Sequence, residues 1–226
     1  MIENQRKIGN TNYKIAVKKL KIPHSSFLIP NLLLILRAIM KKIAILASGS
    51  GSNAENIIKY FSGNENVEVP FVISNRKEVY VHERCKNLGV PSYVFPKSDF
   101  ESGVVTKFLL ENNIDLVVLA GFLLRVPDDM LMSYPNRVLN VHPSLLPKYG
   151  GKGMFGDNVH KAVVENKETE SGITIHFLNE RFDEGEHIAQ YKCEVLPTDT
   201  PEEVASKVHA LEYEWYPKVI EKVLFA

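Results

Sequence analysis

The chain has 226 residues, 45% hydrophobic and 24% charged, which is typical of a globular protein and excludes disordered, collagen-like and coiled-coil classes. It carries 27 basic and 27 acidic residues, but residues 1–39 hold seven of the basic residues and only one of the acidic ones. The rest of the chain therefore has a net charge of −6, which argues against a nucleic-acid partner because binding phosphates needs a basic surface.

Residues 1–39 differ from everything that follows. They are basic at first and apolar from Phe27 onward, with three interruptions. The longest uninterrupted apolar run, Leu32–Leu36, is far shorter than the roughly 20 residues that cross a bilayer, so we expect no membrane partner. We interpret this segment as a dispensable leader or a start assigned too early, with residues 40–226 as the functional domain. A segment lying on a membrane surface is the alternative.

From residue 41 onward, short apolar runs alternate with stretches of helical spacing. The predicted strands are rich in Val, Ile or Leu and cover Lys41–Leu46, Val69–Ser74, Ser92–Phe95, Asp115–Ala120 and Val138–Val141. The predicted helices cover Asn53–Phe61, Val79–Leu88, Phe100–Asn112 and Asp128–Tyr134. Repeated β-α units pair in parallel through right-handed crossovers. The predicted fold class is therefore α/β, an open, mostly parallel, Rossmann-like sheet with helices on both faces.

The last part of the chain lacks this alternation. Two strand patterns, Gly172–Leu178 and His187–Val195, follow one another without a helix and predict a hairpin-like strand pair. Pro201–Leu224 then has the spacing of an amphipathic helix that closes the chain.

A glycine-rich segment, Ala47–Ala54 (ASGSGSNA), follows the first predicted strand. Glycine lets a backbone turn tightly and approach a phosphate, and the next helix offers free N–H groups. The segment matches the dinucleotide pattern G-x-G-x-x-G/A, yet the second strand ends in Ser74-Asn75-Arg76 and not in an acid that would bind a ribose. The interleaved Ser and Asn residues favour a single phosphate group. A turn that needs glycine only for its shape is the alternative.

The segment Asn140–Pro147 (NVHPSLLP) places polar side chains at a strand end. Asn140 and His142 are two residues apart and project to the same side of a strand. Pro143 cannot continue a central ladder, so both side chains lie at the carboxyl end, where open α/β sheets bind ligands. An amide and an imidazole there can stabilise an oxyanion and move a proton. A histidine satisfied by backbone in a turn is the alternative.

Nearby segments add His176, on an alternating strand, and Asp183, in the loop that follows. A carboxylate near His142 would orient the imidazole and stabilise its protonated form. We expect no metal, because no ligand spacing repeats among these residues. The chain lacks a G-x-S-x-G motif, which argues against a serine hydrolase. Its two cysteines are too few for a disulfide framework and favour a reducing, cytoplasmic location.

Three segments together resemble the phosphoribosylglycinamide formyltransferase family: Gly49–Asn53 (GSGSN), Asn140–Gly151 (NVHPSLLPKYGG) and Ser171–Gly185 (SGITIHFLNERFDEG). The resemblance extends from about Met40 to the end of the chain. It implies transfer of a formyl group from the co-substrate 10-formyltetrahydrofolate to the amine of glycinamide ribonucleotide in purine synthesis. It also implies small-molecule partners only, catalysis without a metal, and a monomer or homodimer.

The resemblance also implies roles for particular residues. Asn140 and His142 match the catalytic Asn-x-His of the family, and Asp183 matches its catalytic aspartate. The residues matched to binding of the ribonucleotide phosphate and ribose are Gly49, Ser50, Gly51, Ser52, Asn53 and Glu212. The side chains matched to folate binding are Phe122, Leu123, Leu124, Arg125, Val126 and Asn140, with backbone of the loop Asn179–Asp183.

The match departs from the family pattern at two places. Relatives commonly carry an arginine where this chain has Leu124, with Arg125 next. The loop Tyr149–His160 looks longer than in some relatives, and His160 matches the histidine that follows this loop.

Other functions share parts of this pattern. A formyltetrahydrofolate deformylase has the same Asn-x-His…Asp set but would need an amino-terminal regulatory domain longer than 39 residues. A methionyl-tRNA formyltransferase would need a further carboxy-terminal domain and a basic face. A non-catalytic NADP-binding module could use the glycine segment and Arg76, but it leaves Asn140, His142 and Asp183 unexplained.

Overall fold

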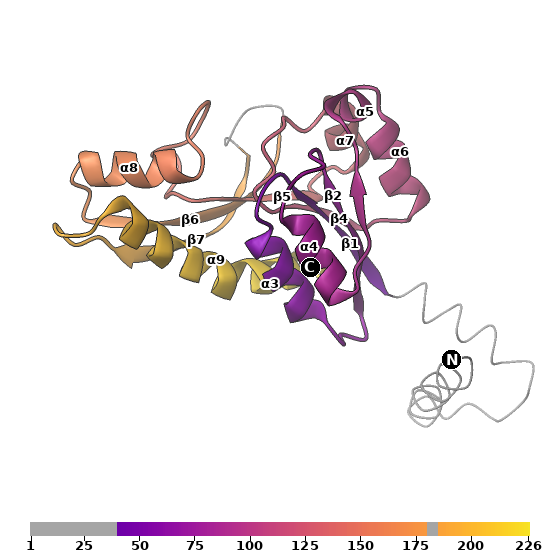
Figure 1. Cartoon of the computed structure of the whole chain (residues 1–226), viewed down its shortest axis with the longest axis horizontal. Coiled ribbons are helices and arrows are strands. Elements are labelled where there is room, and N and C mark those ends of the chain that lie inside the picture. The colour runs from indigo at the N-terminus through magenta and orange to yellow at the C-terminus, as the bar shows by residue number, and fades with distance from the viewer. Residues whose placement is uncertain (1–39, 180–184) are drawn as a thin grey trace, which may run out of the picture. The chain divides into compact units, whose positions relative to one another are not determined.

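The computed structural model describes residues 40–179 and 185–226. These residues form one seven-stranded sheet with the strand order β3-β2-β1-β4-β5-β6-β7 (Figure 1). The strands are β1 (Lys41–Ala47), β2 (Val67–Ser74), β3 (Ser92–Val94), β4 (Leu116–Leu119), β5 (Val138–His142), β6 (Glu170–Phe177) and β7 (His187–Glu194). The helices are α3 (Ser52–Phe61), α4 (Val81–Leu88), α5 (Lys97–Glu101), α6 (Val104–Glu111), α7 (Asp128–Ser133), α8 (Asp157–Glu165) and α9 (Pro201–Leu224).

The sheet is parallel in its first five strands and antiparallel in its last two. β1 pairs in parallel with β2 and β4, β2 with β3, and β4 with β5. β6 pairs antiparallel with both β5 and β7. The predicted α/β fold with a carboxy-terminal strand pair is therefore confirmed. The order reverses between β1 and β4, and open α/β sheets bind ligands at the carboxyl ends of strands on either side of such a point.

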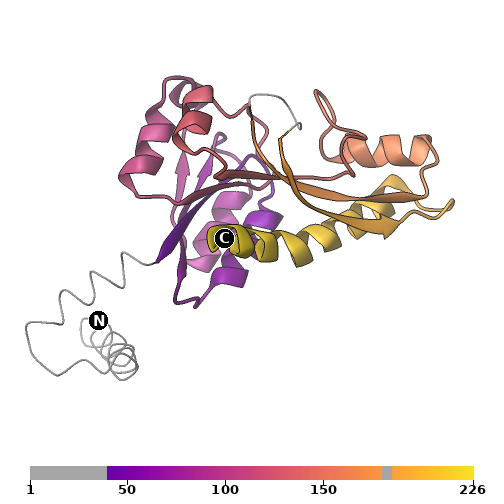
Figure 2. The same cartoon turned by 180° about the vertical axis from the view of Figure 1, so that it is seen from behind.

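Helices cover both faces of the sheet because apolar residues of its strands alternate between two cores. In β1, Ile43 and Ile45 belong to the core under α3, α4 and α9, whereas Ala44 and Leu46 belong to the core under α5, α6 and α7. Figures 1 and 2 show the two layers from opposite sides, with α9 running along β6 and β7 and past α3.

The closing helix α9 is fixed at both ends. Thr200 and Glu203 form a reciprocal capping box at its start, with backbone-to-side-chain bonds of 2.8 and 3.2 Å. Near its end, the fully buried Tyr216 donates its hydroxyl proton to the Leu119 and Leu139 carbonyls, with O···O distances of 2.9 and 3.2 Å. This side chain ties α9 to β4 and β5, the strands that lead into the candidate site.

One predicted helix and one predicted loop were wrong in detail. The predicted helix Phe100–Asn112 is two helices, α5 and α6, because Gly103 between them has a left-handed backbone with φ of 77°. The segment predicted as a loop up to His160 already contains the first turn of α8, which was not predicted. Val159 and Val163, one helical turn apart, are both buried and hold α8 on the core. Across the described residues, no helix combines the length and apolar character of a membrane span.

Candidate active site

Buried Ser48 joins the segments that follow β1, β2 and β4. Its Oγ donates to Asn75 Oδ1 at 2.6 Å and accepts from the Leu123 backbone N–H at 2.9 Å. Its own backbone N–H donates to the Gly121 carbonyl at 3.0 Å. The glycine segment after β1 is therefore held beside Gly121 and residues 122–126, the segment matched to folate binding.

The side chains of the predicted folate segment have different environments. Val126 is buried in the core under α5, α6 and α7, and the ring of Phe122 packs on Phe100 with centroids 5.2 Å apart. Arg125 is paired with Asp128, its Nη2 2.6 Å from Oδ1. Val126 thus offers a ligand its backbone only, and its role in folate binding stays a prediction.

The two glycines of the loop have different surroundings. Gly51 caps α3 with a left-handed φ of 74°, and a Cβ built on it would lie 2.4 Å from Val81 Cγ2. The fold itself therefore requires glycine at position 51. At Gly49 a Cβ would meet no atom within 4 Å. The space beside Gly49, at the N-terminus of a ten-residue helix, is where a phosphate could approach the backbone.

Arg84 on α4 fixes this loop, and the sequence did not predict its contribution. Its Nε donates to the Ser50 carbonyl at 2.9 Å, and its guanidinium also pairs with Glu55 in the first turn of α3. The residue had no sequence signal of its own. Its contacts join α4 to the glycine loop and to α3, and the contact with the loop ends on a backbone oxygen.

Asn53 and Glu212 meet although they are 159 residues apart in the sequence. Asn53 Nδ2 donates to Glu212 Oε2 at 2.8 Å, and the same oxygen lies 2.9 Å from His209 Nδ1. Glu212 is only 4% exposed. The structure thus brings together two residues matched to ribonucleotide binding and adds His209, which the sequence analysis missed. The i, i+3 spacing of His209 and Glu212 on a predicted helix was a signal for this pair.

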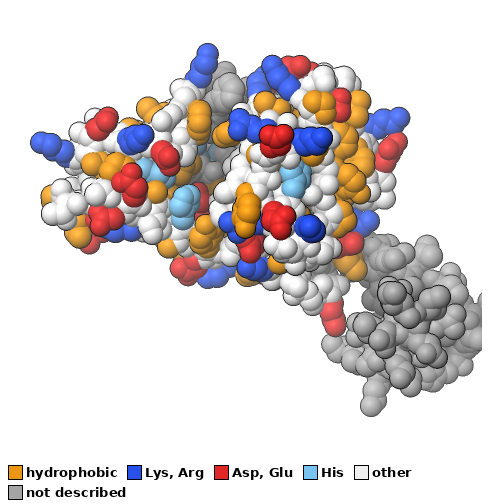
Figure 3. Space-filling model, viewed as in Figure 1, with side chains coloured by type: hydrophobic (Ala, Val, Ile, Leu, Met, Phe, Trp, Pro, Cys, Tyr) orange, Lys and Arg blue, Asp and Glu red, His pale blue; other side chains and the backbone are white. Residues whose placement is uncertain are grey.

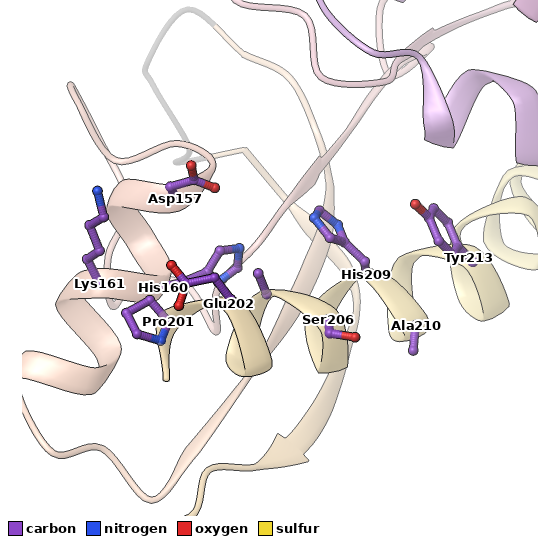
Figure 4. Close-up of a pocket in the computed structure, with 10 residues that line it drawn as sticks. Asp157, His160, Lys161, Pro201, Glu202, Ser206, His209, Ala210 and Tyr213 are labelled. Carbon is purple, nitrogen blue, oxygen red and sulfur yellow. The ribbon is translucent and has the colours of Figure 1, made fainter. Parts of the chain in front are cut away.

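A second histidine faces this group from α8. The rings of His160 and His209 lie 6.1 Å apart, and His160 is 1% exposed. The hydrogen bond to Glu212 raises the pKa of His209, whereas burial, followed by the charge of His209, lowers the pKa of His160. Both rings line a cavity of about 600 Å³ between α8 and α9 (Figure 4).

We expect the two histidines to titrate on opposite sides of the ordinary histidine pKa of about 6.5. Glu212→Gln removes the carboxylate that stabilises protonated His209, so the pKa of His209 should fall. NMR titration of both rings in the wild-type protein and the variant measures this. Glu214→Gln is the matched control, because Glu214 lies on the same helix and pairs with Lys218.

The same shift predicts how stability depends on pH. Because the pKa of His209 is raised in the folded protein, its protonation stabilises the fold below about pH 6.5. That stabilisation is lost as the pH rises through the raised pKa. Glu212→Gln should therefore lower Tm more at low pH than above the pKa of His209, and an equal loss at every pH would contradict this interpretation.

Asn140 is oriented by His176 at the end of β5. The two residues are directly opposite each other in the antiparallel pair of β5 and β6, and Asn140 Nδ2 lies 3.2 Å from His176 Nε2. His176 Nδ1 lies 3.0 Å from the Phe177 carbonyl, which can only accept a hydrogen bond. In the neutral form of His176 the proton therefore lies on Nδ1, and Nε2 accepts from the Asn140 amide. One of the two amide hydrogens of Asn140 remains for a further acceptor.

His142 lies on the same face, two residues further along β5, as the sequence predicted. It is 4% exposed, and its Nε2 lies 2.7 Å from the Tyr149 carbonyl. Since the carbonyl can only accept, Nε2 carries a proton. Asp183, predicted as the catalytic aspartate, lies outside the described residues.

Charged side chains of both signs are interspersed on the face of the molecule shown in Figure 3. Within residues 40–179 and 185–226, no group of three or more His, Cys, Asp or Glu side chains is arranged to hold a metal ion. The polar groups described at the carboxyl edge of the sheet are the Asn140 amide, the His142 and His176 imidazoles, the Glu212 carboxylate and the N-terminus of α3. Such a site suits acyl-group transfer between small molecules.

An open α/β sheet with a glycine loop at its switch point and an Asn-x-His pair at the end of β5 defines a class of group-transfer enzyme. The sequence profile of one family, described as formyl transferase, matches residues 41–220. The chain belongs to this family.

Its relatives include named enzymes. The chain is 40% identical over 187 residues to "Phosphoribosylglycinamide formyltransferase, chloroplastic" of Arabidopsis thaliana, covering 80% of this chain and 64% of the relative. It is 34% identical over 192 residues to the phosphoribosylglycinamide formyltransferase of Bacillus subtilis (strain 168), and this match covers 82% of this chain and 95% of the relative. The crystal structure of phosphoribosylglycinamide formyltransferase from Streptococcus pneumoniae TIGR4 superposes with a TM-score of 0.73 at 36% identity. The superposition covers 83% of this chain and 100% of that one.

The chain is shorter than the plant relatives that it matches. It spans 64% of the length of the Arabidopsis protein and 60% of the length of the one from Vigna unguiculata.

Proposed function

We propose that this protein transfers the formyl group of 10-formyltetrahydrofolate to the amine of glycinamide ribonucleotide, a step of purine biosynthesis. The observation that carries the proposal is the placement of Asn140 and His142 on one face at the end of β5. The similarity to enzymes named phosphoribosylglycinamide formyltransferase supports the choice of substrates.

The ribonucleotide is proposed to bind along the first turn of α3. Its phosphate accepts hydrogen bonds from the backbone of Gly49–Asn53, where the open space beside Gly49 allows close approach. Glu212, buried and bonded to Asn53, lies at the far side of this loop and accepts hydrogen bonds from the ribose hydroxyls. The folate is assigned to residues 122–126 and Asn140, next to the same loop.

Attack of the neutral amine on the formyl carbon forms a C–N bond and converts the formyl oxygen into an alkoxide. The second amide hydrogen of Asn140 and a protonated His142 stabilise this negative charge. The ammonium formed at the same time loses its proton, with Asp183 as the assigned acceptor, directly or through water. The alkoxide then re-forms the C=O bond as the C–N bond to the folate breaks, and the folate nitrogen takes up the proton that the ammonium released. Positioned donors and acid–base groups of this kind each contribute about 10²- to 10⁴-fold.

Residues 40–226 are proposed to hold this catalytic domain, because the family match begins at residue 41 and Met40–Ala226 forms one unit. The proposed partners are the two small-molecule substrates, bound by a monomer or a homodimer. Every step above uses protein side chains, so the proposal includes no metal. A cytoplasmic location stays a prediction, since the Arabidopsis relative is named as chloroplastic.

An assay that follows the formyl carbon tests this function. The full chain is incubated with 10-formyltetrahydrofolate labelled at that carbon, with and without glycinamide ribonucleotide. We expect labelled formylglycinamide ribonucleotide, and turnover only when the ribonucleotide is present. Release of labelled formate without the ribonucleotide would instead make the protein a deformylase. No turnover together with saturable NADP binding would favour the dinucleotide-binding alternative.

A further inference from the structure

The ring of His142 is held in part by a backbone carbonyl outside β5. Its Nε2–H donates to the carbonyl of Tyr149, seven residues further along the chain, at 2.7 Å. A hydrogen bond to a carbonyl fixes which ring nitrogen carries the proton and how the ring is turned. The position of His142 therefore depends on whatever holds the Tyr149 peptide in place.

The backbone of Tyr149 adopts a conformation that its own sequence does not favour. Its φ is 55°, in the left-handed region that residues with a Cβ rarely occupy. Such a conformation persists only where the surroundings determine it. One contribution comes from the preceding turn, where Ser144 Oγ donates to the Lys148 carbonyl at 2.6 Å and the Lys148 N–H donates to the Leu145 carbonyl at 3.2 Å.

A second contribution comes from Glu168, in the turn that follows α8. The Tyr149 hydroxyl donates to Glu168 Oε1 at 3.0 Å, and Lys148 Nζ lies 3.1 and 2.9 Å from the two carboxylate oxygens. The Glu168 backbone N–H is itself bonded to the Val163 carbonyl at 3.1 Å. These hydrogen bonds lower the pKa of Glu168, so its carboxylate stays charged. Two consecutive side chains of the strained segment are thus tied to one carboxylate in the turn after α8.

We propose that Glu168 is a positioning residue for His142, acting through the hydroxyl of Tyr149 to hold the Tyr149 carbonyl against the Nε2–H of His142. This inference rests on the proposed function for its effect on turnover. Glu168 does not contact the substrates in this account. It keeps the imidazole in the tautomer that carries its proton on Nε2.

The test separates the hydroxyl contact from the charge. Glu168→Ala and Tyr149→Phe each remove the contact, and each should lower kcat about 10-fold or more, as small misplacements of a catalytic group do. KM for both substrates should stay within about two-fold, because ground-state binding is unaffected. Glu168→Gln keeps an oxygen acceptor for the hydroxyl and should restore most of the activity. Glu170→Gln is the matched control, since Glu170 pairs with the exposed Lys192.

A readout on His142 itself distinguishes positioning from general loss of structure. ¹⁵N NMR of the imidazole should give one tautomer, protonated at Nε2, in the wild-type protein and in Glu168→Gln. It should give a mixture of tautomers in Glu168→Ala and Tyr149→Phe. Unchanged tautomer populations in both of these variants would overturn the proposal, whatever their kcat. If the wild-type protein transfers no formyl group, the proposed function fails, and the NMR comparison still tests the link between Glu168 and His142.

Discussion

Asn140→Ala is expected to lower kcat for formyl transfer by about 10²- to 10³-fold, the loss typical of removing one oxyanion donor. In the proposed mechanism, one amide hydrogen of Asn140 is held by His176 and the second stabilises the alkoxide that forms during attack. Because that charge is absent from the bound substrates, KM should change little. Steady-state kinetics with both substrates measures the two constants separately. Asn112→Ala is the control, because Asn112 bonds the Phe108 carbonyl at the end of α6.

A second variant tests whether Asn140 acts in the same transition state as the acid–base group. Asp183→Asn removes a charge but keeps the shape of the side chain, and kcat should fall by roughly 10²-fold. If both residues stabilise one transition state, the double variant should lose less than the product of the single losses. Losses that multiply fully would place Asp183 in a different step from Asn140.

Gly51→Val is expected to weaken both ribonucleotide binding and the stability of the fold. The structure supplies the reason for the loss of stability. The loop assignment alone predicts weaker binding of the ribonucleotide, more than of the folate. The structure adds that the new Cβ would collide with Val81 and that valine would have to adopt a left-handed φ. Overpacking costs about 1–3 kcal/mol and the backbone conformation about 1–2 kcal/mol, so the free energy of unfolding should fall by about 2–5 kcal/mol. Denaturant unfolding measures this loss.

Gly49→Ala is the matched variant that tests ligand binding without disturbing the fold. The added methyl group meets no protein atom within 4 Å, so stability should change by less than about 0.5 kcal/mol. The methyl group would lie where the phosphate approaches the backbone, so KM for the ribonucleotide should rise about 10-fold or more while KM for the folate stays nearly constant. Equal changes in both KM values, or none, would remove Gly49 from the phosphate site.

The strands were predictable because their apolar residues alternate or run together, and that pattern follows directly from burial on a sheet covered on both faces. The placement of Asn140 and His142 was predictable for a similar reason. A two-residue period and a following proline put both side chains on one face at a strand end. The split between α5 and α6 was harder to predict, because one left-handed glycine ends an otherwise continuous helical pattern.

The contacts that hold the site in place could not be predicted from the sequence. The bond between Asn53 and Glu212 joins α3 to α9 across 159 residues and depends on how these helices pack. Tyr149 reaches His142 through its backbone carbonyl, and any residue type has such a group. Periodicity and motif spacing report which side chains are buried or grouped locally. They carry no information on which backbone oxygen meets the ring of His142.

We propose above that the carboxyl ends of β1, β4 and β5 form one site for both substrates. A crystal structure of the full chain with glycinamide ribonucleotide and a folate whose formyl group cannot be transferred tests it directly. We expect the phosphate on the backbone N–H groups of Gly49–Asn53, with the formyl oxygen within hydrogen-bond distance of Asn140 Nδ2. A ribonucleotide bound wholly in the cavity between α8 and α9, or a formyl group out of reach of both Asn140 and His142, would contradict it.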